Sequence, residues 1–390
     1  MSLGVYIHFP YCRAKCRYCD FFSLTSPAPH EAYAAAICRE LQLRRPQWSG
    51  RVAGSLYLGG GTPSLWEPAA LGRALAAIRQ AVPFEEGAEW TIEANPGTVD
   101  APRLAALRAL GLDRLSLGVQ SFDDALLRQL GRIHARWDVL LAVSAARAAG
   151  FGEISLDLIY GLPGQTLAGA AADLDEALAL APEHLSIYEL MVTNLEAPTP
   201  LARDVERGLA VLPDEEVTFE MGRAAVERAE AAGLARYEIS SFARPGHRAR
   251  HNQLYWNGGE YLGLGLGAVG FALCDPARPE LGGRRWTNTR DPSRYFEALA
   301  RGELAEADGE DLDAATLFEE RLLLGLRQCE GLDLDAVGGA LAIDPSEIAA
   351  IWRRAEPLIG EGWARRAGGR LWLTRAGLDL HGDLVLRLLG

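Results

Sequence analysis

Short apolar runs alternate with longer amphipathic stretches along the first half of the chain. The runs are rich in Val, Ile, Leu and aromatic residues, which predicts buried strands, and the Ala-, Leu- and Arg-rich stretches between them have helical spacing. Strands separated by helices predict an α/β fold with a parallel sheet and right-handed crossovers. Polar residues at the ends of the strands favour a barrel-like sheet over a flat, doubly wound one. The predicted strands are Val5–Phe9, Ser55–Leu58, Trp90–Ala94, Arg114–Val119, Ile154–Tyr160 and Leu185–Glu189, and the predicted helices are Glu31–Leu43, Pro68–Gln80, Pro102–Leu110, Asp138–Ala149 and Ala168–Leu180.

The pattern changes after about residue 210, which predicts three units with the bounds 1–210, 211–305 and 306–390. The second unit begins with a helix and continues into an aromatic, glycine-rich stretch. In the third unit, helices precede a hairpin whose turn, Gly368-Gly369, supplies positive φ. This order is typical of a winged-helix-like domain, either a DNA-binding module or, as the acidic chain favours, a packing or partner-contact module. The predicted elements are helix Asp214–Ala232, strand-like run Tyr237–Phe242, helices Ala314–Leu326, Asp333–Leu341 and Pro345–Glu361, and hairpin Trp363–Thr374.

Composition narrows the functional classes. The chain has 390 residues, a net charge of −13 and 49% hydrophobic residues, so a globally basic nucleic-acid binder is excluded and no nucleic-acid partner is expected. Lys15 is the only lysine, which leaves no Schiff-base or P-loop lysine. No signal peptide is recognised, and no apolar run reaches the roughly 18 residues of a membrane span. We therefore expect a cytoplasmic protein, whose reducing environment suits free thiols.

Three cysteines, Cys12, Cys16 and Cys19, follow the first predicted strand with CxxxCxxC spacing. Three thiolates so closely spaced can hold three irons of a [4Fe–4S] cluster and leave the fourth iron open to a non-protein ligand. S-adenosylmethionine (SAM) can bind such an iron through its amino and carboxylate groups. The alternative is a zinc site, but zinc sites usually pair two separated CxxC-type knuckles, and the sequence has no second one.

Further polar residues lie at or beyond the ends of the predicted strands. The glycine-rich turn Gly59–Ser64 leaves room for close approach of a ligand, or is a plain tight turn. A carboxylate inside an apolar strand, as at Asp157, is costly to bury unless it is paired. Any one such residue could cap a helix or pair with an arginine. Together they predict a rim that binds the ribose and adenine of SAM, and Arg132 could neutralise the SAM carboxylate with its planar fork. The rim residues are Glu93, Asn95, Gln120, Ser121 and Asp157.

The stretch His251–Trp256 carries His, Tyr and Trp at short spacing. These side chains can ligate and stack on a planar macrocycle, because histidine is a common heme ligand. From residue chemistry alone, a core or capping histidine beside two packed aromatic residues is the favoured interpretation.

Taken together, these motifs resemble the HemN/HemW family of the radical-SAM superfamily. The resemblance implies a partial (β/α)6 radical-SAM barrel, a mixed α/β extension and a C-terminal winged-helix-like domain. The oxidase branch typically has a fourth cysteine two residues beyond the triad, where this chain has Phe21, and HNxxYW marks the heme-chaperone branch. The matching stretches are Val5–Cys12, the cysteine triad, Gly59–Ser64, Thr91–Pro96, Ser116–Phe122, Gly131–His134, Asp157–Pro163, Tyr237–Ser240 and His251–Trp256.

The resemblance assigns a role to each matching residue. Cys12, Cys16 and Cys19 would bind the [4Fe–4S] cluster, and His251 would contact heme. Val269 stands where the family usually has a further histidine. The residues expected to contact SAM are Tyr6, Tyr18, Gly60, Gly61, Thr62, Glu93, Gln120, Arg132 and Asp157, with Tyr18 near the nucleotide or a second bound molecule.

The function implied by the resemblance is that of a cytoplasmic heme chaperone, which binds the cluster, SAM and heme. It would deliver heme to acceptor proteins such as respiratory cytochromes, acceptors at a membrane included. The alternatives are a radical-SAM enzyme, either an oxygen-independent coproporphyrinogen III oxidase or a HemN-like methyltransferase, and, ranked far behind, a DNA-binding regulator. The sequence leaves open whether SAM is cleaved.

Overall fold

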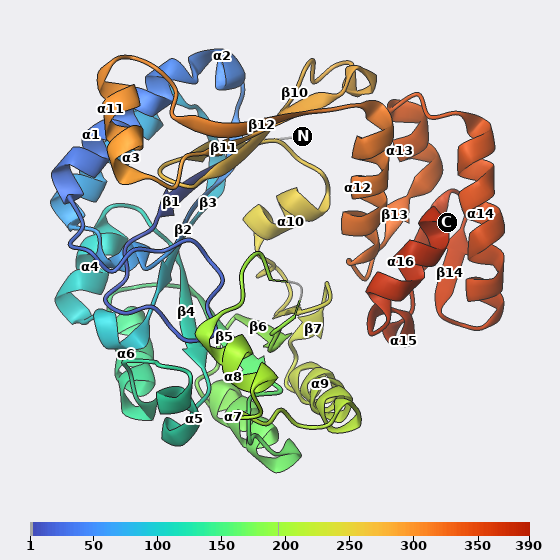
Figure 1. The fold of residues 1–390 in the computed structure, drawn as a ribbon, viewed down its shortest axis with the longest axis horizontal. Helices are drawn as coiled ribbons and strands as arrows, with labels where there is room; N and C mark the ends of the chain where they lie inside the picture. Colours follow the sequence, from blue (N-terminus) through green and yellow to red (C-terminus); the bar gives the residue numbers. More distant parts are fainter. Residues whose placement is uncertain (1–2, 194) are drawn as a thin grey trace.

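In the computed structural model, which describes residues 3–193 and 195–390, twelve strands form one open sheet. Its central part consists of six parallel strands that lie side by side in the order in which they occur in the chain (Figure 1). These strands are β1 Leu3–Phe9, β2 Ala53–Gly60, β3 Phe84–Ala94, β4 Arg114–Gln120, β5 Glu153–Tyr160 and β6 His184–Glu189. All six predicted strands are confirmed, with small differences at their ends.

Helices connect the strands and cover one face of the sheet (Figure 1). Because the strand order never reverses, the sheet is a barrel type rather than a doubly wound type, and the predicted barrel-like α/β fold is confirmed. The five predicted helices are present as α1 His30–Leu43, α3 Pro68–Ala81, α4 Ala101–Ala109, α6 Arg136–Ala148 and α7 Leu167–Ala179. Three shorter helices were not predicted: α2 Arg45–Trp48, α5 Asp124–Gln129 and α8 Pro200–Glu206.

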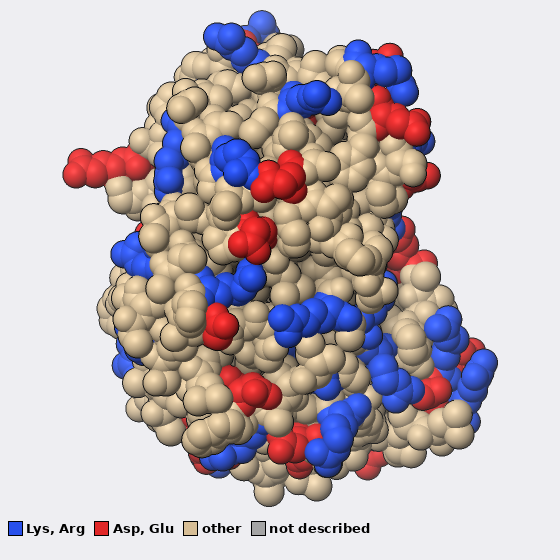
Figure 2. Space-filling view, turned by 90° about the vertical axis from the view of Figure 1, so that its left-hand side faces the viewer, with Lys and Arg blue, Asp and Glu red and all other residues tan. Residues whose placement is uncertain are grey.

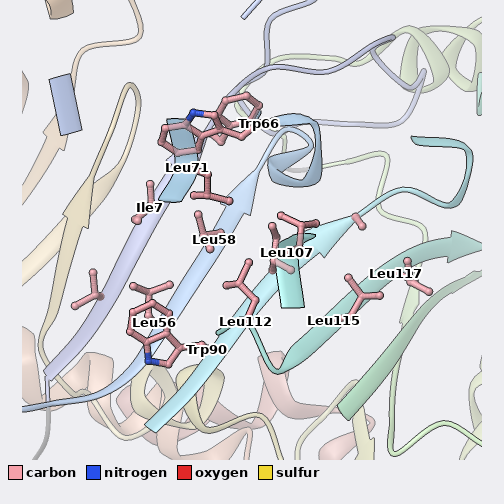
Figure 3. Close-up of a cluster of buried hydrophobic side chains, with 14 of the residues drawn as sticks. Ile7, Leu56, Leu58, Trp66, Leu71, Trp90, Leu107, Leu112, Leu115 and Leu117 are labelled. Carbon is pink, nitrogen blue, oxygen red and sulfur yellow. The ribbon is translucent and has the colours of Figure 1, made fainter. Parts of the chain in front are cut away.

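Alternation along the strands separates a helix-facing core from the barrel interior. Leu115 and Leu117 of β4 are fully buried and belong to the same apolar cluster as Leu107 of α4 (Figure 3). The neighbouring residues of β4, Arg114 and Ser116, point the other way because successive side chains of a strand alternate between faces. The outer face of these helices carries interspersed positive and negative side chains (Figure 2).

The second part of the chain widens the sheet at both edges. Strand β9 (Tyr261–Leu264) pairs in parallel with β1, and β10 (Val269–Leu273), β11 (Gly283–Asn288) and β12 (Glu306–Leu312) follow in antiparallel order. At the other edge, β7 (Ala235–Arg236) and β8 (Ser241–Ala243) form a hairpin on β6. The run Tyr237–Phe242 is therefore largely the turn of this hairpin, closed by a hydrogen bond from Tyr237 N to Ser241 O, and not one strand.

Residues 211–305 also contain three helices. They are α9 Glu215–Ala231, predicted from the sequence, and α10 Arg250–Trp256 and α11 Pro292–Ala300. The aromatic HNxxYW stretch thus forms helix α10, which packs on β2.

The C-terminal part has its own apolar core. Three predicted helices and the predicted hairpin are present, and a short strand completes a three-stranded sheet in the order β13-β15-β14. The division of the chain at residues 210 and 306 stays a prediction, and β12, which begins at Glu306, belongs to the large sheet. The elements are α12 Ala314–Leu326, β13 Leu332–Asp333, α13 Leu334–Ala340, α14 Pro345–Gly360, β14 Ala364–Ala367, β15 Arg370–Leu373, α15 Arg375–Leu378 and α16 His381–Leu389. Within the described residues, no helix combines the length and apolar character needed to cross a membrane.

A buried carboxylate joins the first helix to the widened edge of the sheet. Glu40 of α1 has no exposed surface and accepts hydrogen bonds from Arg44 Nε at 2.9 Å and Asn288 Nδ2 at 2.6 Å. It also accepts from Tyr295 Oη at 2.8 Å and from the backbone N–H of Gly265 at 2.8 Å. Removing the carboxylate would take one acceptor from each of these donors, although the Arg44 guanidinium keeps Glu306 and Asn288 Nδ2 keeps the carbonyl of Gly265.

We predict that Glu40→Ala lowers the free energy of unfolding by about 3–5 kcal/mol, because it leaves a buried guanidinium and three further donors short of an acceptor. Glu31 of the same helix is the matched control, since its side chain is 69% exposed and pairs with the exposed Arg73. Glu31→Ala should cost less than about 1 kcal/mol. Urea unfolding of both variants measures the difference, and equal losses would contradict a structural role for Glu40.

Candidate functional site

The three cysteines lie on the loop between β1 and α1, and all three are partly buried. Backbone hydrogen bonds fold this loop on itself and tie it to the segment after α5. Cys12 N donates to Leu24 O at 2.8 Å, and Arg17 N donates to Leu130 O at 2.9 Å. The spacing seen in the sequence therefore belongs to a loop with a defined path at the carboxyl end of β1.

The sulfur atoms have polar neighbours. Thr62 Oγ1 donates to Cys12 Sγ at 3.5 Å, and Arg132 Nη1 donates to Cys16 Sγ at 3.4 Å. Burial raises the pKa of Cys12 and raises that of Cys19 to about 11, and the neighbouring thiols add to both shifts. The Cys12 and Cys19 thiols are thus neutral until a metal's positive charge favours the thiolates.

The chemistry and placement of the three thiols fit an iron–sulfur cluster. Among the described residues, no three His, Cys, Asp or Glu side chains converge as ligands of one metal ion do. In a [4Fe–4S] cluster each thiolate binds a different iron, so its ligands need not converge on one point as those of a single ion do.

The glycine turn after β2 packs directly against the segment that leads into Cys12. Gly60 has φ of +109°, and a Cβ there would lie 2.6 Å from the His8 ring. A Cβ on Gly61 would lie 2.6 Å from the carbonyl carbon of Pro10. Thr62 continues this contact, since its N–H donates to Tyr11 O at 3.0 Å. Glycine is required here for close packing of two backbones, which holds Thr62 beside Cys12.

A cavity of about 520 Å³ lies next to the cysteine loop and extends into the barrel interior. This volume lies within the usual range of about 300–1,000 Å³ for small-molecule sites. Of the predicted site residues, Tyr18, Cys19, Glu93 and Asp157 line it. Other lining residues include Phe21, Tyr57, Thr91, Arg114, Ser116, Ser155, His184, Ser186, Tyr188, Met191 and Asn252.

Two buried carboxylates stand out in this cavity. Glu93 accepts hydrogen bonds from Tyr57 Oη at 2.8 Å and from Gly60 N at 3.1 Å. Asp157 accepts from Ser116 Oγ at 3.0 Å and from Ser155 Oγ at 3.4 Å. Burial raises the pKa of each carboxyl group to about 7, and for Asp157 the nearby charge of Glu93 adds to the shift. Near neutral pH each group can therefore accept or donate a hydrogen bond.

Gln120 ends β4, and Arg132 lies after the following helix, α5. Gln120 is a non-glycine residue with φ of +70°, and its side-chain oxygen accepts a hydrogen bond from Tyr188 Oη at 3.0 Å. Arg132 donates to Asn95 Oδ1 and to the carbonyl of Gly118 as well as to Cys16. Strained backbone of this kind persists where surrounding contacts hold it and is common at functional sites.

Three aromatic rings, those of His8, Tyr57 and His251, lie near the Tyr6 ring. Its hydroxyl shares a hydrogen bond of 3.0 Å with His8 Nδ1, and its ring stacks on Tyr57 at a centroid distance of 6.2 Å. Burial raises its pKa, so the hydroxyl remains protonated. Tyr6 thus supports the wall of the cavity through Tyr57.

His251 lies in helix α10, next to the first half of β2, and has no exposed surface. Its Nδ1 shares a hydrogen bond with Ser55 Oγ at 2.8 Å, and its Nε2 shares one with Tyr255 Oη at 2.9 Å. Burial lowers the pKa of the ring to about 3, so the imidazole is neutral. The heme contact at His251 stays a prediction, and it would require one of these hydrogen bonds to be given up.

Several lining residues were missed in the sequence analysis: Tyr57, Ser116, Ser155, His184, Ser186 and Tyr188. The signal that could have found them is a period of two. Polar residues recur at every second position of β4 to β6, between apolar residues that face the helices.

The shifted pKa of Asp157 predicts a pH dependence of stability. The carboxyl group ionises near 3.8 in the unfolded chain and near 7 in the folded chain. Between these values the folded chain binds more protons, so the contribution of Asp157 to stability falls as the pH rises from about 4 to about 7.

Relative to wild type, Asp157→Asn should therefore gain stability over this interval, on the order of a few kcal/mol, and show no further relative change above it. Urea unfolding of both proteins between pH 5 and 8 measures the difference. Parallel pH profiles would show that the folded-state pKa of Asp157 is close to its ordinary value.

Comparison with known proteins agrees with this geometry. Residues 6–177 match the model of the radical SAM superfamily, and residues 312–380 match that of the HemN C-terminal domain. The heme chaperone HemW of Mycobacterium tuberculosis is 36% identical over 392 residues, covering 99% of this chain and 95% of the relative. HemW of Escherichia coli is 37% identical over 76% of each chain. The coproporphyrinogen III oxidase HemN of Escherichia coli shares the fold, with a TM-score of 0.82, 23% identity, and coverage of 99% of this chain and 90% of that one. The family resemblance of the motifs is thereby confirmed, and the chain belongs to the HemW family of radical-SAM proteins.

Proposed function

We propose that this protein is a heme chaperone that binds a [4Fe–4S] cluster and SAM, holds heme as cargo and delivers it to acceptor proteins. Its relatives from Mycobacterium tuberculosis, Bacillus subtilis and Escherichia coli are named heme chaperones. The acceptors in this proposal are hemoproteins such as respiratory cytochromes, membrane-associated ones included. The protein would act in the cytoplasm and without a nucleic-acid partner.

The observation that carries the cofactor part of the proposal is the cysteine loop next to a polar cavity. Cys12, Cys16 and Cys19 would hold three irons of the cluster, which supplies an electron for cleavage of the SAM sulfonium bond when it is bound and reduced. Arg132, beside Cys16, would hold the SAM carboxylate with its planar fork. The radical-SAM superfamily match to residues 6–177 supports both cofactors.

The two carboxylates of the cavity suit the nucleoside. Ionised Asp157 and Glu93 can accept hydrogen bonds from ribose hydroxyls, and each can donate when protonated, since both have a pKa of about 7. Tyr18 offers an aromatic face to the same cavity. Tyr6, Gly60, Gly61, Thr62 and Gln120 would shape the SAM site around these groups.

Phe21 favours the chaperone over the oxidase. In the oxidase branch of the family, a fourth cysteine typically stands at this position. Phe21 is 71% exposed and lines the cavity. Met191, also exposed, lines the same cavity. An apolar rim of this kind suits a planar, apolar cargo. His251 is proposed as a heme contact, and Val269 of β10 offers no ligand of its own.

The enzymatic alternatives are coproporphyrinogen III decarboxylation and a HemN-like methyl transfer. Their favouring observation is that Tyr18, Glu93 and Asp157, three of the residues that we assign to SAM binding, line one cavity beside the cysteine loop. Product analysis for 5′-deoxyadenosine therefore accompanies the heme experiments below.

We predict about four iron and four sulfide ions per chain after anaerobic reconstitution, the stoichiometry of a [4Fe–4S] cluster. Replacing Cys12, Cys16 and Cys19 together with Ala should abolish the visible cluster absorbance. Cys274→Ala, at an exposed position away from the loop, is the matched control and should keep it. Full cluster absorbance in the triple variant would disprove the assignment.

We also predict that the reconstituted protein binds hemin and does not decarboxylate coproporphyrinogen III. His251→Ala should shift the Soret band or weaken hemin binding about tenfold, because a neutral imidazole ligand is lost, while the cluster absorbance stays. His247→Ala is the histidine control and should bind hemin as wild type does. Sustained conversion of coproporphyrinogen III with SAM turnover would make the oxidase the correct function. Unchanged hemin spectra in His251→Ala would remove His251 from the heme site.

A further inference from the structure

Arg321 of helix α12 is a buried cation without a counter-ion. Its side chain is 8% exposed, and among the described residues no carboxylate oxygen lies within the 4.0 Å of a salt bridge. Its one hydrogen bond runs from Nη2 to the carbonyl of Gly258, at a weak 3.5 Å. Burial lowers the pKa of Arg321, and the charge of Glu260, which pairs with Arg51, offsets only part of this shift.

The guanidinium lines a cavity of about 230 Å³ between α12 and the widened edge of the sheet. The rest of the wall is largely aromatic and aliphatic, with Tyr255, Tyr261, Phe271, Leu317 and Leu324. One carboxylate, Glu320, also lines the cavity, but both of its oxygens already accept from Arg285 Nη2, at 2.8 and 2.6 Å. Arg321 is therefore the cation whose charge is left uncompensated in this wall.

A buried charge without an ion-pair partner is costly, and the chain retains it here in a pocket whose other charged side chains, Arg285 and Glu320, pair with each other. A ligand with a carboxylate would supply the missing charge, and the planar fork of arginine suits a carboxylate geometrically. The aromatic walls would cover an apolar body next to that carboxylate. At about 230 Å³, the cavity is smaller than the roughly 300 Å³ of small ligand pockets, so it suits a small ligand or one end of a larger one.

We propose that this cavity is a binding site for a carboxylate carried on an apolar body, with Arg321 as the anion-binding residue. The cavity adjoins the HNxxYW helix, because the ring of Tyr255 lines it while the Tyr255 hydroxyl is bonded to His251 Nε2 at 2.9 Å. A propionate edge of heme has the required chemistry, and this choice of ligand rests on the proposed heme function. A free aromatic carboxylate has the same chemistry and is the second source.

The test uses the full chain, with Arg321→Met as the variant and Arg353→Met, at an exposed position of α14, as the control. Hemin and hemin dimethyl ester, which lacks the propionate charges, are titrated by absorbance. We expect wild type and Arg353→Met to bind hemin at least about tenfold tighter than the ester, and Arg321→Met to lose that preference. Sodium benzoate, the small-carboxylate probe, is tested separately by thermal unfolding.

The porphyrin and benzoate titrations distinguish a heme propionate from a small free carboxylate as the ligand. They also distinguish failure of the Arg321 site from failure of the proposed heme function. A rise in the melting temperature of wild type with benzoate, absent in Arg321→Met, supports the site for a small carboxylate even if the porphyrins are not distinguished. Binding of neither porphyrin by wild type overturns the heme function, and the benzoate arm then decides the site alone. Equal affinity for hemin and ester, together with no benzoate shift, overturns the site.

The unliganded variants provide a further check. If the role of Arg321 is to bind an anionic ligand, Arg321→Met without ligand should melt at the same temperature as wild type or higher, because a buried charge without an ion-pair partner is removed. A melting temperature several degrees lower would show that Arg321 stabilises the fold itself and would overturn the proposal.

Discussion

The buried carboxylate of Glu40 is the interaction on which the placement of the cysteine loop depends. It collects hydrogen bonds from its own helix, from the β9–β10 turn, from β11 and from α11. Helix α1 is the element that directly follows the cysteine loop, so its position sets where the loop must end. Tyr33 of the same helix strengthens this arrangement, since it donates to the carbonyl of His8 at the other end of the loop and accepts from Leu266 N. Both ends of the loop are thus held by polar contacts inside the core.

The barrel interior contains two carboxyl groups whose pKa values lie well above their ordinary values. Glu93 and Asp157 lie in one cavity with raised pKa values, while Arg132 stands by the cysteine loop at its rim. Because the charge of Glu93 raises the cost of ionising Asp157, a ligand that hydrogen-bonds Glu93 changes the protonation of Asp157. A cationic ligand such as the SAM sulfonium would favour the ionised forms, which couples its binding to proton release.

Helix α10 connects two cavities that the sequence did not relate. Asn252 lines the large cavity near the cysteine loop, and Tyr255 lines the small cavity beside Arg321. Between them His251 is locked into the core by Ser55 and Tyr255. Trp256 ends the helix under the guanidinium of Arg327, at 4.0 Å from the ring centroid, which links α10 to α12. The aromatic residues of HNxxYW therefore hold helix α10 in place, besides the heme contact proposed for His251.

The sequence by itself determined the strand and helix pattern, the cysteine triad and the family, because alternation, helical spacing and ligand spacing are local properties. Sequence-local reasoning also placed Glu93, Gln120 and Asp157 at the carboxyl ends of strands or inside them. Only the tertiary structure decided what these residues touch. Gly60 leaves room for the His8 ring and Gly61 for the backbone of Pro10. His251 is buried with both ring nitrogens bonded, since α10 returns across β2 from almost 200 residues later in the chain. The uncompensated charge of Arg321 likewise follows from the docking of α12 against distant strands, and no local pattern encodes a contact made across such a separation.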